Sequence, residues 1–280
     1  MLSTREIQLE EKKILDQVVK ILNDNKLNYF LCGGTLLGSI RHEGFIPWDD
    51  DIDIAMPRPD HDKLQELLKE EKIVTSNDLL SHSITLNNLN LYFTKVYNHK
   101  IRIYDYRYKD FYEKYLWIDI FPIDFIPSDE KKCKKLFKKR KILQKILMIR
   151  KMSIKYIFQN KKRFLINIFK LFLKILLLIL PEKFITQLIY NLIKKDTKNS
   201  SKYAGNIAWK IGMKERMNKE IFDEYEFLDF EGSKYRGLKK YNEFLINIYG
   251  DYMTLPPEDK RVTHSFEAWR VEENDEENKK

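Results

Sequence analysis

The sequence predicts an α+β fold, with a mixed β-sheet and flanking helices joined to a basic, helix-rich segment. Strand-like and helix-like patterns are interspersed up to about residue 127. From about residue 130, long stretches rich in Lys, Ile and Leu favour helices. The charge is also uneven. Residues 1–130 carry a net charge of −7, residues 131–174 carry +17 without a single acid, and residues 175–280 carry −1.

These changes in character predict four parts. Residues 1–129 should form the α/β core, 130–200 the basic helical segment, 201–270 a part that completes the core, and 271–280 a disordered tail. The 280 residues suffice for a full hydrophobic core. Two cysteines and an N-terminus without an apolar signal core predict a cytoplasmic protein.

The elements of the first half can be placed from their end signals. Ser3-Thr-Arg-Glu6 is a capping-box pattern, and it precedes a helix that should end near residues 23–25. Tyr29–Cys32 is expected as a short buried strand, Gly33-Gly34 as a turn, and Thr35–Arg41 as a helix. Later elements follow by the same signals: a strand at Asp51–Met56, a helix at Asp60–Lys72, strands at 84–97 and 101–106 around an Asn98-His99 turn, a strand at Trp117–Phe121, and a helix ending near Gly250.

Four aspartates, Asp49, Asp50, Asp51 and Asp53, lie within five positions. On a strand, the run D-I-D-I would turn Asp51 and Asp53 to one face, about 6.6 Å apart, and the isoleucines to the core. A solvated acidic loop would not need this alternation. A calcium EF-hand would need Gly and Glu at positions 6 and 12, and both are absent. The pattern therefore favours a site for a hard divalent cation, Mg²⁺ or Mn²⁺.

A two-metal phosphoryl-transfer site needs a further carboxylate. Asp119, in the strand-like run W-I-D-I-F, is the best candidate, and an isolated acid at a strand end is the alternative. Asp124 is the next candidate. The double glycine and Thr35 could cradle a phosphate, because missing Cβ atoms allow close approach and the following helix offers free N–H groups. Arg41 lies two turns further on.

Three longer stretches of the sequence together resemble a known family. GTLLGSIRHEGFIPWDDDIDIAMPR, WIDIFPID (117–124) and YGDYMTLPPEDKR (249–261) look like the LicD family of phosphotransferases, which is related to the fukutin-type enzymes. The similarity is dense over about 29–64, good at 92–124 and returns at 237–261, whereas 130–200 shows no matching motif. The resemblance implies a nucleotidyltransferase-like catalytic core. It implies transfer of a phospho-alcohol group, best known as phosphocholine, from a CDP-activated donor to a hydroxyl of a glycan or its lipid-linked precursor.

The resemblance also suggests roles by position. Asp51 and Asp53 match the D-x-D metal ligands, Asp119 matches the third acid less securely, and Asp49 matches an aspartate that supports the metal. On this basis we expect Arg41 to neutralise charge on the transferred group, and Gly33, Gly34 and Thr35 to bind the donor phosphates. Three further residues are weaker candidates: Lys95 for a phosphate, and Arg261 and His264 for the acceptor side. If the donor carries choline, its trimethylammonium group needs an aromatic cage, and the candidates are Trp48, Tyr92, Tyr115 and Trp117. The alternative is that these four residues are ordinary core aromatics.

The basic segment contains an apolar stretch, Phe164–Leu180, with Arg163, Asn167, Lys170 and Lys174 along one stripe. A membrane span would bury Lys170 and Lys174 at about 2.5–3.5 kcal/mol each. A core helix and a helix lying in the membrane interface remain open. The +17 charge favours an anionic membrane surface as the partner of 131–180, and hence a peripheral protein on the inner face of the cytoplasmic membrane.

Two other functions share some of these features. An RNA nucleotidyltransferase would use NTPs with the same G-G…D-x-D core and could bind RNA through the basic segment. The WIDIFPID and YGDYM stretches argue against it, so no nucleic-acid partner is expected. A non-catalytic, membrane-associated interaction protein is the second alternative, and the presence of all the expected acids argues against that function.

Overall fold

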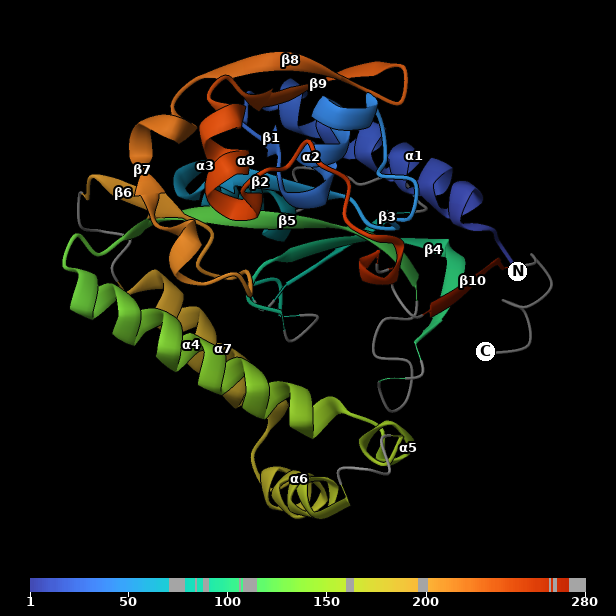
Figure 1. Ribbon diagram of the computed structural model, residues 1–280, viewed down its shortest axis with the longest axis vertical. Coiled ribbons are helices and arrows are strands. Elements are labelled where there is room, and N and C mark those ends of the chain that lie inside the picture. The colour runs from blue at the N-terminus through green and yellow to red at the C-terminus, as the bar shows by residue number, and fades with distance from the viewer. Residues whose placement is uncertain are drawn as a thin grey trace.

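The structure is a computed structural model that describes residues 1–70, 79–83, 85–87, 91–105, 107, 115–159, 164–195, 201–261, 263 and 266–271. It confirms the α+β class, with a curled mixed sheet and helices on both sides (Figure 1). The helices are α1 (Thr4–Asp24), α2 (Gly33–His42), α3 (Arg58–Lys69), α4 (Glu130–Lys151), α5 (Ile154–Ile157), α6 (Phe164–Leu177), α7 (Glu182–Lys194) and α8 (Tyr241–Tyr249). The strands are β1 (Phe30–Leu31), β2 (Asp53–Pro57), β3 (Leu79–His82), β4 (Thr94–Asp105), β5 (Tyr115–Ile126), β6 (Tyr203–Gly205), β7 (Met217–Asn218), β8 (Tyr225–Phe230), β9 (Ser233–Leu238) and β10 (Phe266–Arg270).

The main sheet brings together strands that are distant in sequence. Its central path runs β1-β2-β5-β4-β10, while β3 pairs with β4 and β6 links β5 to β7. Only β2 and β5 run parallel among the described pairs. The strand β10 pairs with β4, and the Leu2 N–H donates to the Ala268 carbonyl at 2.7 Å. Both ends of the described chain therefore meet at one edge of the sheet.

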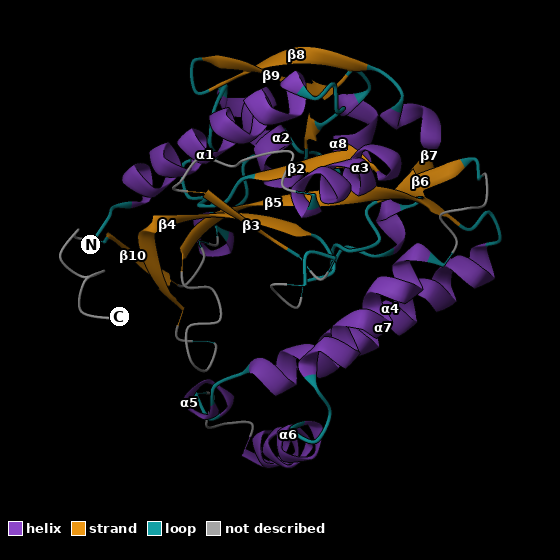
Figure 2. Ribbon diagram, turned by 180° about the vertical axis from the view of Figure 1, so that it is seen from behind, coloured by secondary structure: helices purple, strands orange, loops and turns teal. Residues whose placement is uncertain are grey.

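The sheet separates two layers (Figures 1 and 2). The helices α1, α2, α3 and α8 and the β8–β9 hairpin lie on one side. On the other side α4 packs along α7, and α5 and α6 lie beyond them, farthest from the sheet. The main core is formed where α1 meets the sheet, through fully buried residues such as Ile14, Leu15, Ile54 and Ile118.

Helix ends follow the sequence signals closely. The side chain of Ser3 accepts from the Glu6 N–H, and Glu6 in turn accepts from the Ser3 N–H at 2.8 Å, so the predicted capping box opens α1. The helix α8 ends at Gly250, whose φ of +77° suits glycine. These two predictions are confirmed because capping depends on local chemistry alone.

Two strand predictions were wrong. The strand predicted to begin at Asp51 begins at Asp53, because pairing with β1 and β5 starts there. Asp51 therefore precedes β2 and does not share its pleat with Asp53. The Asn98-His99 turn is absent, since β4 continues through it and a register shift between Asn98 and Arg102 takes up the irregularity.

Other boundaries also moved. The helix expected at 60–72 starts at Arg58, and Pro59 occupies its first turn. The strand expected from residue 84 starts at Thr94, and the one expected at 117–121 extends over Tyr115–Ile126. Six of the described strands were not predicted: β3, β6, β7, the two strands of the β8–β9 hairpin, and β10. The tail predicted at 271–280 falls, from residue 272 on, outside the described residues.

Within the described residues, none of the helices has both the length and the apolar content needed to cross a bilayer by itself. Only the pair α6 and α7 passes that test jointly, and a bend of 94° separates its two members. The predicted helix at Phe164–Leu180 is confirmed in outline, with its last three residues in a turn after α6.

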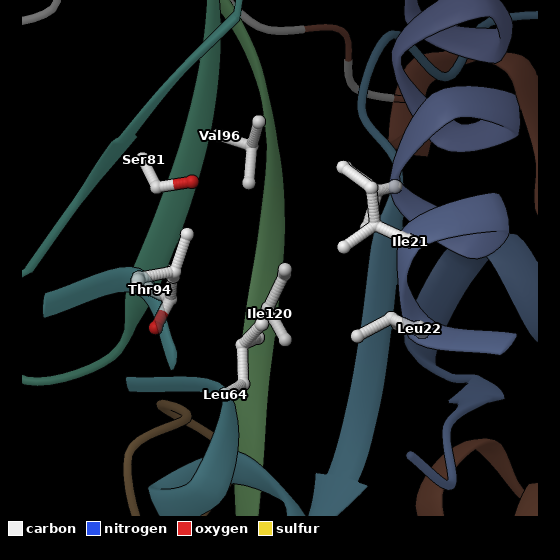
Figure 3. Close-up of a pocket in the computed structure, with 9 residues that line it drawn as sticks. Ile21, Leu22, Leu64, Ser81, Thr94, Val96 and Ile120 are labelled. Atoms are coloured by element: carbon white, nitrogen blue, oxygen red, sulfur yellow. The ribbon is translucent and has the colours of Figure 1, made fainter. Parts of the chain in front are cut away.

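A small apolar gap lies between α1, α3 and the sheet (Figure 3). It is lined by residues that include Leu22, Leu64, Val96 and Ile120, and its volume is about 20 Å³. This is room for about one water, and the walls offer almost no polar partners. The gap is a packing feature and not a ligand site.

Candidate active site

Three charged side chains lie in one row across three neighbouring strands. Asp53 begins β2 and pairs in parallel register with Asp119 of β5, which pairs in turn with Lys95 of β4. Side chains that lie opposite each other in a sheet point to the same face. The Lys95 Nζ approaches the Asp119 carboxylate at 2.9 Å, and it also lies 4.1 Å from the centre of the Trp117 ring. The sheet thus holds two carboxylates and one ammonium side by side.

The double glycine lies against the acids. It opens α2 and does not form a separate turn as expected, with Gly33 at a φ of +58°. A Cβ on Gly33 would come within 3.0 Å of the Asp53 carboxylate and 2.6 Å of the Trp209 ring, and one on Gly34 within 2.5 Å of Asp49. The Thr35 hydroxyl accepts from the Asp53 N–H at 2.8 Å. The N-terminus of α2 is therefore packed directly against the carboxylates of residues 49–53, here called the acidic loop.

The electrostatics of the acids are those of a crowded cluster. Burial, together with the negative charge of Asp51, Asp119 and Asp49, raises the pKa of Asp53 well above its usual value, and Lys95 opposes this. The fully buried Glu11 of α1 also belongs to this cluster, since its pKa is raised by burial and by the four aspartates at 49–53. Holding so many carboxylates together destabilises the fold unless a cation or protons neutralise them.

A cavity of about 350 Å³ opens beside this row. One wall is the sheet, with Asp53, Lys95 and Asp119, and Asp51 lies next to it. The opposite wall comes from α4, through Gln144, Leu147, Met148 and Lys151. The remaining lining is mostly aromatic, with two further basic residues: Leu91, Tyr92, Phe93, Arg107, Trp117, Phe121, Ala208, Trp209 and Lys210. The volume suits a small organic ligand, and charged groups face it from both walls.

The structure separates the predicted site residues into two groups. Asp51, Asp53, Asp119 and Lys95 line the cavity, and Gly33, Gly34, Thr35 and Asp49 lie behind them. Arg41 does not line it, since its guanidinium donates to the Tyr252 carbonyl at 2.8 Å. Arg261 stacks on Trp48 at 4.5 Å, next to the acidic loop but outside the cavity. His264 falls outside the described residues. The roles expected of Arg41, Arg261 and His264 stay predictions.

The donor set suits a hard cation. Asp51, Asp53 and Asp119 offer carboxylate oxygens from one cavity wall, which is the chemistry that Mg²⁺ and Mn²⁺ prefer. Among the described residues, no three acids, histidines or cysteines already converge on one point. The ammonium of Lys95 now pairs with Asp119. A cation held by these carboxylates would therefore have to draw Asp51 inward and compete with Lys95.

Several lining residues escaped sequence reasoning. The sequence places the α4 residues only in a basic segment, because the many lysines around them hide any amphipathic pattern. Trp209 lies in a loop whose turn is held by the Asn206 side chain, which accepts from the Trp209 N–H at 3.0 Å. Glu11 did carry a signal, because it lies with Ile7, Ile14 and Val18 on the apolar stripe of α1.

Asp124 has a different role from Asp119. Both of its oxygens accept from the Arg58 guanidinium, at 2.6 and 2.7 Å, and both side chains are buried. Asp124→Asn should lower the free energy of unfolding by about 3–5 kcal/mol, because it removes the buried, two-oxygen partner of the Arg58 guanidinium and leaves only the partly exposed Asp62, at 3.3 Å. Urea denaturation measures this, and the double variant Arg58→Met/Asp124→Leu should recover most of the loss. A loss below about 1 kcal/mol would contradict the structural role.

Known proteins share this arrangement of motifs. Residues 26–167, about half of the chain, match the family described as "LicD/FKTN/FKRP, nucleotidyltransferase domain". The chain is 31% identical over 277 residues to the lipopolysaccharide cholinephosphotransferase LicD of Haemophilus influenzae, an alignment that covers 95% of this chain and 97% of that protein. The chain belongs to the LicD family. Two uncharacterised Rickettsia proteins, from R. typhi and R. prowazekii, match 23% and 21% of it at 39% and 38% identity, and the aligned regions cover 23% and 22% of those proteins.

Membership makes the chain a LicD-type transferase. The family match includes the acidic loop, β4 and β5, and the whole α4 wall, so the matched region contains nearly all of the cavity. Ala208, Trp209 and Lys210 lie after the matched region. They line the cavity from a loop that the longer alignment with the Haemophilus protein covers.

Proposed function

We propose that this LicD-type enzyme transfers phosphocholine from CDP-choline to a hydroxyl of a cell-surface glycan or its lipid-linked precursor, with Mg²⁺ as cofactor. The relative from Haemophilus influenzae, a lipopolysaccharide cholinephosphotransferase, supports the transferred group and the glycan acceptor. The observation that carries the proposal is the row of Asp53, Asp119 and Lys95 on the wall of one ligand-sized cavity. Phosphoryl transfer needs little more than such positioned charges.

The cavity can hold a diphosphate. Four basic side chains line it, and they come from separate elements: Lys95, Arg107, Lys151 and Lys210. Their charge offsets that of the donor phosphates, and Lys95 is the one beside the reacting end because it contacts Asp119. The glycines at the start of α2 lie behind Asp53 and Asp49, so their contribution to the site is to let these carboxylates approach the N-terminus of the helix closely.

The aromatic lining fits the choline group. Of the four predicted cage residues, Tyr92 and Trp117 line the cavity, whereas Trp48 is covered by Arg261 and Tyr115 is not part of the lining. Phe93, Phe121 and Trp209 add three further rings. A trimethylammonium group binds to aromatic faces through cation–π attraction, so a wall of this kind favours choline over an uncharged alcohol.

The acids complete the chemistry. Asp51, Asp53 and Asp119 would hold Mg²⁺, with Asp49 supporting them, and the bound ion would stabilise charge on the donor phosphates and on the departing CMP. Asp119 also accepts the proton of the acceptor hydroxyl. That oxygen forms a new bond to the phosphorus of phosphocholine as the bond from phosphorus to the CMP oxygen breaks.

We further propose that the enzyme works in the cytoplasm, on the inner face of the cytoplasmic membrane, with no nucleic-acid partner. Both cysteines, Cys32 and Cys133, are free and buried, in keeping with a reducing compartment. The basic segment 131–180 supplies the attraction to anionic lipid.

A donor screen tests the function. CDP-choline, CDP-ethanolamine, CDP-glycerol and CDP-ribitol are each mixed with the protein, and thermal shift and CMP release are measured with Mg²⁺ or with EDTA. CDP-choline should give the largest shift, and CMP release should require both Mg²⁺ and a glycan acceptor. Consumption of ATP or CTP with RNA, or indifference to all four donors, would show the proposal to be wrong.

A further inference from the structure

The helix α6 carries two of its three polar residues on the inside, and the third, Lys170, is half-buried. Asn167 and Lys174, part of its polar stripe, are only 2% and 6% exposed. The Lys174 Nζ donates to the Arg150 carbonyl, near the C-terminus of α4, at 2.5 Å. The Arg150 guanidinium donates in turn to the Leu180 carbonyl, just beyond α6. A surface helix of a globular protein has the opposite arrangement, with polar residues outward.

The outward side of α6 is consequently apolar. Each of its large side chains on this side is at least 40% exposed, and those of the following turn and of the start of α7 continue the surface. This apolar face consists of Phe164, Leu165, Ile166, Ile168, Phe169, Phe172, Ile175, Leu176, Leu178, Ile179, Leu180, Phe184 and Leu188. Soluble monomers rarely expose continuous apolar surface of this extent, and such surfaces mark sites of protein or membrane contact.

Charge argues for lipid over a second copy of the chain. The apolar face begins in the segment 131–174, which carries +17 and no acid, and continues beyond it to Leu188. Exposed lysines lie along α4 and α5 and at the start of α7, including Lys138, Lys145, Lys155 and Lys183. Two copies joined through this face would bring two such segments together, which like charges oppose. A bilayer with anionic headgroups neutralises them instead.

Dimensions argue for a helix lying in the membrane plane. At 1.5 Å per residue, the 14 residues of α6 span about 21 Å, short of the hydrocarbon thickness of about 30 Å. The helix also lies at the far end of the molecule from the sheet in both views (Figures 1 and 2), so no other described element stands between its outer face and a flat surface.

We propose that α6, with the turn after it and the start of α7, inserts its apolar face into the surface of an anionic bilayer. This reverses the orientation that the polar stripe alone suggests, because the stripe secures α6 to α4 and the apolar side meets the lipid. The same α4 forms one wall of the cavity through Gln144, Leu147 and Lys151. Docking therefore places the cavity near the membrane, and the acceptor is a saccharide carried on a lipid. This last step rests on the proposed transferase function.

Vesicle co-sedimentation of the full chain tests the docking. The vesicles contain phosphatidylethanolamine and phosphatidylglycerol, or phosphatidylcholine alone. The protein should bind the anionic vesicles preferentially, and Leu165→Ser/Phe169→Ser/Phe172→Ser should weaken that binding on the order of 10²-fold. A matched control replaces three equally exposed apolar residues elsewhere, Phe227→Ser/Ile246→Ser/Met253→Ser, and should bind like the wild type. Both variants keep the net charge.

Two results would overturn the docking. One is undiminished vesicle binding by the α6 variant. The other is a lipid-free dimer, seen by light scattering, that this variant converts to a monomer, because the face would then join two copies of the chain.

A separate assay tests the acceptor. Lipopolysaccharide in vesicles is compared with its soluble, delipidated oligosaccharide, with CDP-choline as donor. The α6 variant should lose at least about tenfold in rate on the vesicle-borne acceptor and keep its rate on the soluble one. Equal losses on both would contradict the lipid-borne acceptor. If the wild type released no CMP with either acceptor, both the lipid-borne acceptor and the proposed transferase function would be wrong. The vesicle-binding experiment would still test the docking by itself.

Discussion

Asp53→Asn is expected to abolish transfer, with a loss on the order of 10³-fold or more in kcat, while the folded structure is retained. Asp53 lines the cavity, pairs in register with Asp119 and is almost completely buried, so the loss of its charge removes one of the carboxylates that would hold the cation. The amide has the same shape and keeps the backbone bond between Asp53 and Thr35. CMP release from CDP-choline measures the loss.

The same variant should be more stable than the wild type in chelator. Burial and the neighbouring acids raise the pKa of Asp53 in the folded state. Because the folded state then holds this proton more tightly than the unfolded chain, stability falls as the pH rises from the unfolded value of about 3.9 through the raised folded value. In EDTA, the Tm of the wild type should therefore fall between pH 5 and 8 more steeply than that of Asp53→Asn.

Asp50→Asn is the matched control for both measurements. It also removes one charge from the acidic loop, but Asp50 does not line the cavity. It should keep activity within about threefold of the wild type. If Asp53→Asn remained active, or if Asp50→Asn lost as much activity as Asp53→Asn, the assignment of Asp53 to the reacting end of the cavity would be wrong.

Gly33→Ala should destabilise the protein and remove most activity. A left-handed backbone costs a non-glycine residue about 1–2 kcal/mol. The added methyl would also meet the Trp209 ring at 2.6 Å and the Asp53 carboxylate at 3.0 Å, at a further cost of about 1–3 kcal/mol. Movement of either neighbour changes the cavity, because both line it. Urea denaturation and CMP release report the two effects separately.

Gly232→Ala separates backbone strain from the clash. Its φ of +72° is also left-handed, but an added Cβ there would meet nothing within 4 Å. It should therefore lose stability only through the backbone and keep its activity. Gly33→Ala should lose more stability than this control. Similar losses of stability in the two variants, with activity intact in both, would contradict this prediction. They would mean that the positions of Trp209 and Asp53 do not depend on the absence of a side chain at residue 33.

Local chemistry could be predicted from the sequence, and long-range pairing could not. The capping box of α1, the end of α8 at Gly250 and the burial of Ile52 and Ile54 all follow from neighbouring residues. The start of β2 does not, because it depends on where β1 and β5 offer hydrogen-bond partners. For the same reason, Asn98-His99 looks like a turn but lies within a long paired strand.

The candidate site divides in a similar way. Its acids could be named because D-x-D and W-I-D-I-F are compact motifs, and their place beside one cavity agrees with that interpretation. The α4 wall and Trp209 could not be named, since they reach the cavity only through tertiary packing. The orientation of α6 could not be predicted either, because a polar stripe does not reveal whether it faces water or a neighbouring helix.

The pairing of β10 with β4 has a consequence for how the protein is made. The sheet edge closes only when residues 266–270 reach strand β4, more than 160 residues earlier in the chain. The acidic loop leaves the ribosome first, the α4 wall follows, and Trp209 and β10 come last. A chain interrupted before residue 200 thus carries the acids without an enclosed cavity. An enclosed cavity requires Trp209 and its neighbours, and the non-local pairing of β10 with β4 is a slow kind of folding step.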